Sequence, residues 1–132
     1  MKSMYKRILL TITCFFLWAH ANAQLSPAED VGNGIRIGKV STISRYFETI
    51  VSLTINSNQT GYSKAQAEIV LTDFFNKNTP TEFLLVNSGS TNDNSHFAIG
   101  KLTTSNGKYN VYLLFRIKDG VYTLQELRLN KE

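Results

Sequence analysis

The chain has 132 residues, with 14 Lys and Arg against 10 Asp and Glu and a formal net charge of +4. Lys2, Lys6 and Arg7 supply three of these cations, so the rest of the chain is close to neutral. A near-neutral chain without a Lys/Arg-rich run argues against nucleic-acid binding, which needs cations to neutralise successive phosphates. The single cysteine, Cys14, also lies near the N-terminus, within residues 1–23. No disulfide, thiol nucleophile or cysteine metal ligand is therefore expected in residues 24–132.

Residues 1–23 have the three parts of a secretory signal peptide. Cations precede an apolar run over residues 8–18, and Ala-Asn-Ala at 21–23 forms a small-x-small cleavage site. The apolar run is too short to span a bilayer, and no longer run follows it. We therefore expect cleavage between Ala23 and Gln24, a single mature domain over residues 24–132, and a periplasmic or secreted location.

The first element predicted after the leader is a helix that begins at Ser26. The Ser26 hydroxyl can accept from an orphan backbone N–H, Pro27 suits the first helical position, and Glu29 can close a capping box. Gly38 is expected to end this helix, since glycine readily takes the left-handed conformation found at helix ends. A second, short helix is predicted over residues 40–47.

A strand is predicted over residues 50–55 because apolar and polar side chains alternate there, and a polar turn is predicted over 56–61. The strongest helix signal covers residues 63–77, where Ser63 and Gln66 can form a capping box. The apolar side chains of this segment recur at helical spacing and predict a buried stripe of Ala67, Val70, Leu71, Phe74 and Phe75.

The remainder of the chain predicts an antiparallel sheet with strands at 82–87, 96–104, 109–118 and 121–129. Asn-Gly at 106–107 and Asp-Gly at 119–120 are typical of type I′ hairpin turns, which set the strand register. Regular alternation from these turns assigns every side chain to an inner or an outer face. The helix 63–77 is expected to pack on the inner face near Ala98 and Gly100, whose small side chains permit a close approach.

Regular alternation also predicts a ligand site on the inner face. The few polar groups expected at an apolar cavity there are Tyr46, His96, Tyr122, Glu126 and Arg128. Glu126 and Arg128 either bind a polar headgroup together, or are a structural ion pair or two solvated charges at the end of a strand. His96 is either a general base or a partly exposed histidine without a catalytic role. For isomerase-like chemistry, the available carboxylate base with a stabilising hydroxyl is Glu126 with Tyr122 or Tyr109.

The outer face is predicted to keep more apolar side chains than a fully solvated surface, among them Ile99, Tyr112, Leu114 and Leu127. A two-fold homodimer through this face is one explanation. Cover from the C-terminal residues or from the loop 88–95 is the other. The sequence contains no nucleophile elbow, phosphate-binding loop or metal motif, so no metal or cofactor is expected.

Four groups of residues in chain order carry a resemblance to a known family. They are Tyr-Ser-Lys-Ala-Gln-Ala-Glu at 62–68, Asp-Phe-Phe at 73–75, Ile-Gly-Lys-Leu at 99–102 with Asn-Gly at 106–107, and Gln-Glu-Leu-Arg at 125–128. Together they resemble the DUF4783 family, which consists of small exported proteins of Bacteroidetes. The resemblance implies an NTF2-like, cystatin-related α+β fold, with N-terminal helices and one long helix packed on a curved antiparallel sheet. It implies no activity.

These observations predict an exported, non-catalytic NTF2-like domain that binds either a small apolar ligand or a protein partner of the cell envelope. The alternative is a ketosteroid-isomerase-like enzyme, because the wider fold hosts enzymes, ligand pockets and dimerisation modules alike.

Overall fold

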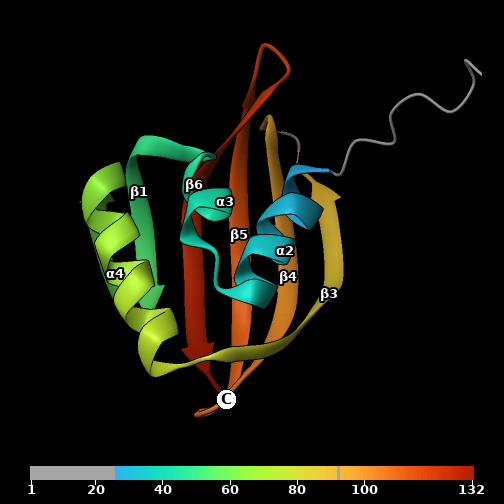
Figure 1. The fold of residues 1–132 in the computed structure, drawn as a ribbon. Helices are drawn as coiled ribbons and strands as arrows, with labels where there is room; N and C mark the ends of the chain where they lie inside the picture. Colours follow the sequence, from blue (N-terminus) through green and yellow to red (C-terminus); the bar gives the residue numbers. More distant parts are fainter. Residues whose placement is uncertain (1–25, 92) are drawn as a thin grey trace, which may run out of the picture.

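The computed structural model describes residues 26–91 and 93–132. In this part of the chain, three helices lie on one face of a six-stranded sheet (Figure 1). Residues 1–23, predicted to be a signal peptide, lie outside the described residues. None of the helices described is long and apolar enough to cross a membrane.

The two longer helices begin where their capping residues predict. In α2 (Pro27–Ile37), the Ser26 hydroxyl accepts from the backbone N–H of Glu29 at 3.2 Å, and the helix ends at a left-handed Gly38. In α4 (Lys64–Lys77), the capping box between Ser63 and Gln66 is complete. Both predicted starts are therefore confirmed.

The other elements differ from the prediction in length. α3 (Val40–Ser44) is shorter than predicted because the chain enters β1 (Phe47–Ile55) earlier. β2 (Asn58–Ser63) lies where the sequence predicts a polar turn, since this edge strand is largely exposed and shows no apolar alternation. The remaining strands are β3 (Pro80–Ser90), β4 (Ser95–Thr104), β5 (Gly107–Lys118) and β6 (Val121–Lys131).

The strands lie in the order β2-β1-β6-β5-β4-β3. Neighbouring strands are antiparallel except β1 and β6, the second and third strands of this order, which are parallel. The pairing is interrupted between β1 and β6, between β3 and β4, and between β5 and β6. Such bulges bend strands and increase their twist, which accounts for the curvature of the sheet.

The two predicted hairpin turns have different outcomes. Asp119 and Gly120 both have positive φ, at 52° and 74°, so the type I′ prediction is confirmed. The earlier turn is centred on residues 105–106, one residue before the prediction, because Thr104 pairs with Gly107. The register between β4 and β5 is therefore two residues away from the predicted one. A shift of two leaves each side chain of these strands on its predicted face.

The core lies between the helices and the inner face of the sheet (Figure 1). α4 packs against α3, β1 and β2, while α2 packs against α3, β3 and β4. The predicted stripe of α4 faces this core, with Ala67, Leu71, Phe74 and Phe75 buried and Val70 packed at its edge.

The predicted packing of the long helix near Gly100 is wrong. The ring of Phe83, from the neighbouring strand β3, occupies that place, and an ideal Cβ on Gly100 would lie 2.4 Å from it. Gly32 of α2 closes the other side of the same ring, since its ideal Cβ would lie 2.9 Å away. The small residue at position 100 therefore accommodates an aromatic ring, and α2 is the helix that covers it.

Candidate functional site

The structure divides the five predicted ligand-binding residues between the two faces of the sheet. Tyr46, His96 and Tyr122 lie on the inner side, next to the buried ring of Phe115. The rings of Tyr46 and Tyr122 meet Phe115 edge to face at centroid distances of 6.2 and 6.3 Å, and His96 meets Tyr122 at 6.1 Å. These three residues form an aromatic cluster at the edge of the core.

The hydroxyl of Tyr46 has a partner that was not predicted. It donates to Asp30 Oδ2 at 2.6 Å, and the same carboxylate forms an ion pair with Arg45. The Arg45 guanidinium also lies over the Tyr46 ring, 5.2 Å from its centroid. Asp30 is in the first turn of α2, so this network ties that helix to the start of β1. No local pattern reveals it, because the partners are about fifteen residues apart in the chain.

Glu126 and Arg128 lie on the outer face, so their predicted inner position is wrong. One extra residue of β6, Gln125, interrupts the pairing with β5 and reverses the face of the residues that follow. Tyr122 and Tyr109 precede the bulge or lie on β5, and both stay on the inner side. Glu126 therefore lies on the opposite face from both tyrosines, so the structure does not bring together the carboxylate and hydroxyl that the isomerase alternative would use.

Glu126 and Arg128 form the ion pair that was the alternative prediction. Arg128 Nε donates to Glu126 Oε1, and the guanidinium lies 4.8 Å from the centroid of the Tyr112 ring. The hydrogen bond to Glu126 raises the pKa of the Arg128 guanidinium above its usual value. The ion pair covers part of the outer face.

Three of the four predicted interface residues lie on the outer face. Ile99 of β4 pairs with Tyr112 of β5, and Leu114 follows two residues later on the same side. The prediction for Leu127 is wrong, because the bulge in β6 places this residue in the core with no exposed surface. Ile99 is 37% exposed and Leu84 of β3 is 57% exposed. Ile99, Tyr112 and Leu114 lie on β4 and β5, and Leu84 lies on β3 opposite Lys101, diagonal to Ile99; these four apolar residues are named the outer strip below.

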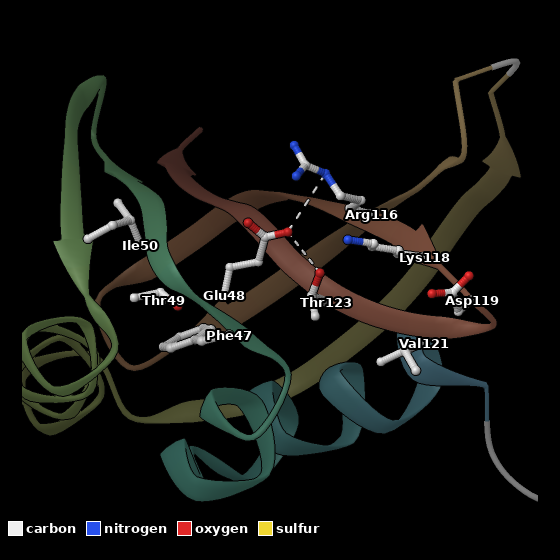
Figure 2. A pocket seen from close by; sticks show the side chains of 9 residues that line it. All are labelled: Phe47, Glu48, Thr49, Ile50, Arg116, Lys118, Asp119, Val121 and Thr123. Atoms are coloured by element: carbon white, nitrogen blue, oxygen red, sulfur yellow. Dashed lines mark hydrogen bonds and ion pairs between the residues drawn. The ribbon is translucent and has the colours of Figure 1, made fainter.

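A cavity that was not predicted lies on the outer face where β1 separates from β6. Phe47 pairs with Leu124 and Ser52 with Glu126, so residues 48–51 of β1 stand opposite residue 125 alone. A space of about 650 Å³ opens between β1 and the β5–β6 hairpin, which projects beyond the rest of the sheet (Figure 1). This space, the hairpin cavity, is lined by Phe47, Glu48, Thr49, Ile50, Arg116, Lys118, Asp119, Val121 and Thr123 (Figure 2).

Glu48 lies at the centre of the hairpin cavity (Figure 2). Its Oε1 accepts from Thr123 Oγ1 at 2.8 Å and lies 3.8 Å from Arg116 Nε. The Glu48 side chain is 26% exposed, compared with 57% for Arg116. With its amide oxygen assigned toward Arg116, Gln125 accepts from Nε and Nη2 at 2.7 and 2.6 Å. The bulge residue of β6 therefore helps to hold the guanidinium at the cavity.

The hairpin cavity combines these charges with apolar side chains. Ile50 and Val121 stand on opposite sides of it and are 60% and 61% exposed (Figure 2). The ammonium group of Lys118 points toward the region of Glu48 and Arg116 (Figure 2). Within the described ranges 26–91 and 93–132, Lys118 takes part in no salt bridge. The same ranges contain no group of three or more His, Cys, Asp or Glu placed to hold a metal ion.

Comparison with known proteins assigns the family. A model described as a domain of unknown function, DUF4783, matches residues 28–130. The chain belongs to the DUF4783 family. The match includes all the helices and strands described above except the ends of α2 and β6, so the predicted family is confirmed.

Solved structures confirm the predicted α+β fold. DUF4783 proteins from Bacteroides uniformis and Bacteroides ovatus are similar to the chain with a TM-score of 0.74 each, at 29% and 27% identity. The alignments cover 79% and 78% of this chain and 95% and 93% of those chains. An NTF2-like protein of unknown function from Silicibacter pomeroyi is 11% identical with a TM-score of 0.60, over 80% of this chain and 90% of that chain. This last likeness shows the NTF2-like fold alone. None of the curated proteins compared with the chain matches it.

Proposed function

We propose that this chain is an exported, non-catalytic binding domain that holds a small ligand in the hairpin cavity. The volume of the cavity carries the proposal, since about 650 Å³ falls within the roughly 300–1,000 Å³ of small-molecule sites. Its lining supports it too, because the apolar side chains of Phe47, Ile50 and Val121 lie beside polar groups, some of which are held in place by hydrogen bonds. The ligand site thus lies on the outer face, in place of the inner cavity predicted from the sequence.

Native mass spectrometry of the chain 24–132, purified gently from its own host, tests ligand binding. We expect a mass above that of the protein alone. In Val121→Trp a large side chain enters the cavity and should remove most of this extra mass. Ile69→Trp is the matched control, because Ile69 is also a largely exposed apolar residue and lies on α4, away from the cavity. Equal retention in both variants would exclude the hairpin cavity as the site, and a clean protein mass would refute ligand binding.

Export is supported by the signal-peptide pattern of residues 1–23. Expression in the host followed by fractionation and intact-mass analysis tests it. We expect a chain that begins at Gln24 in the periplasm or the medium. A full-length chain that stays in the cytoplasm would refute export while leaving the binding proposal open to its own test.

A homodimer through the outer strip is a second candidate, favoured by the exposure of Leu84 and Ile99 beside Tyr112. Exposed apolar patches of this kind mark interfaces, and two-fold pairs are the commonest oligomers. Light scattering coupled to size-exclusion chromatography should give a dimer mass for the unmodified chain. Ile99→Glu should give a monomer, whereas Ile69→Glu on α4 should leave the dimer intact. A monomeric unmodified chain would refute this candidate.

A further inference from the structure

The charges at the hairpin cavity point to the class of ligand. We infer that the cavity takes an amphipathic anion, with a carboxylate head at Arg116 and Lys118 and an aliphatic chain between Ile50 and Val121. This inference rests on the proposed function, because it specifies what the same cavity holds.

The charge at the centre of the cavity favours an anion over a cation. Arg116 and Lys118 both reach this region, where Glu48 is the carboxylate that faces them (Figure 2). Asp119, the other acidic lining residue, belongs to the turn at the tip of the hairpin. The four charged lining residues therefore sum to zero, and the excess of one positive charge is local to the region of Glu48, where a second carboxylate would balance it (Figure 2). Glu48 is also engaged by Thr123, so it is a poor partner for a cationic ligand.

The donors needed to hold a carboxylate are present. A guanidinium carries five N–H donors. Gln125 accepts from two nitrogens of Arg116 on one side of the group, which orients the remainder. Lys118 supplies three further N–H groups, and its ammonium takes part in no salt bridge within the part of the chain that the structure describes. Hydrogen bonds to charged groups are stronger than neutral ones, so a carboxylate gains more here than a hydroxyl.

The apolar side chains that line the cavity are the reason for proposing an aliphatic chain in the ligand. Ile50 on β1 and Val121 on the hairpin are both mostly exposed, and the largely buried ring of Phe47 lies at the base. An aliphatic chain that lies against one of these side chains would remove apolar surface of both the side chain and the ligand from water. A purely ionic ligand such as acetate would leave these walls wet.

Three eight-carbon probes of different charge test the inference: octanoate, octanol and octylammonium. Each is titrated into the ¹⁵N-labelled chain 24–132, and amide shifts at residues 47–50 and 116–123 give the dissociation constants. We expect octanoate to bind about tenfold more tightly than octanol, a difference of about 1.4 kcal/mol, because hydrogen bonds to a carboxylate are stronger than those to a hydroxyl. Octylammonium should bind most weakly.

A charge-removing variant and a matched control test whether the preference for octanoate over octanol arises at Arg116 and Lys118. Arg116→Gln with Lys118→Gln should reduce octanoate binding to the level of octanol and leave octanol binding unchanged. Lys108→Gln with Lys131→Gln removes the same charge from the exposed opposite end of β5 and β6, and should keep the tenfold preference. The dispersion of the amide spectra shows that both variants are folded.

Equal binding of octanoate and octanol would overturn the inference while leaving the proposed function standing, because the cavity would then bind ligands regardless of charge. Tighter binding of octylammonium would overturn it in the same way. If none of the three probes shifts the cavity amides, the inference fails. The proposed function fails with it only if the protein purified from the host also carries no ligand mass.

Discussion

Replacing Gly100 with alanine is expected to destabilise the fold through its contact with Phe83. The added Cβ would lie 2.4 and 2.6 Å from two ring carbons and 2.9 Å from the backbone oxygen of Leu84. Real Cβ atoms essentially never approach other atoms within 3.0 Å, so the ring or the backbone must move. Gly32 of α2 lies against the other edge of the ring, where an ideal Cβ would be 2.9 Å away, so movement of the ring in that direction is limited.

Overpacking of this kind costs about 1–3 kcal/mol of folding free energy. In a domain of this size, 1 kcal/mol corresponds to about 4 °C in melting temperature, so Gly100→Ala should melt about 4–12 °C lower. The matched control is Gly61→Ala in the exposed edge strand β2. There the added Cβ meets Ile50 at 3.6 Å, which is ordinary contact. This control should stay within about 0.5 kcal/mol of the unmodified chain.

Urea denaturation followed by far-UV circular dichroism measures these free energies, since the only tryptophan, Trp18, lies in the leader. A double variant isolates the ring. Phe83→Leu removes ring atoms, so Gly100→Ala should cost less in that background than in the unmodified chain. The packing argument is refuted if the cost is the same in both backgrounds, or if Gly100→Ala costs no more than Gly61→Ala.

Three further predictions test the register, a helix cap and a surface charge. Leu127→Ala should lower the free energy of unfolding, measured by urea denaturation, by about 2–5 kcal/mol because Leu127 is fully buried. Leu114→Ala on the outer face should lower it by about 1 kcal/mol, and the reverse order would contradict the bulge in β6. Ser63→Ala should cost about 1 kcal/mol by removing the N-cap of α4, and an unchanged urea midpoint would refute that role. The hydrogen bond from Lys101 lowers the pKa of the Glu132 carboxyl below 4.5, so an NMR titration midpoint should rise in Lys101→Met and stay low in the unmodified chain. Because the folded-state pKa is the lower one, this contact stabilises the fold above the ordinary pKa, and its contribution is lost as the pH falls through the folded-state value.

The ends of the helices and the position of one hairpin could be predicted from the chemistry of residues close together in the sequence. Ser26 and Ser63 accept from backbone N–H groups only three residues away, and Gly38 takes a left-handed conformation that most residues avoid. The same holds for the type I′ turn at 119–120. Signals of this kind involve neighbours within one turn, so they hold whatever the rest of the chain does. With the ordered motifs, they were sufficient to predict the family and the fold class.

Long-range packing decided which face of the sheet each residue in the second half of β6 occupies. Regular alternation puts Glu126 and Arg128 inside and Leu127 outside, and the folded chain does the opposite by inserting Gln125 as a bulge. The bulge buries Leu127 and Leu129 and leaves the two charged side chains in contact with water, which avoids a large desolvation cost. A register change of one residue leaves no mark in the local pattern, yet it reverses every later side chain.

The hairpin cavity has the same long-range origin. It opens where β1 and β6, strands from opposite ends of the domain, lose their parallel pairing around the bulge. Residues as far apart as Glu48 and Thr123 share no sequence pattern, and only the assembled sheet brings them within hydrogen-bond distance. Local sequence was therefore enough for the elements and the family. The grouping of side chains into a site required the packing of the whole sheet, because that packing sets the register.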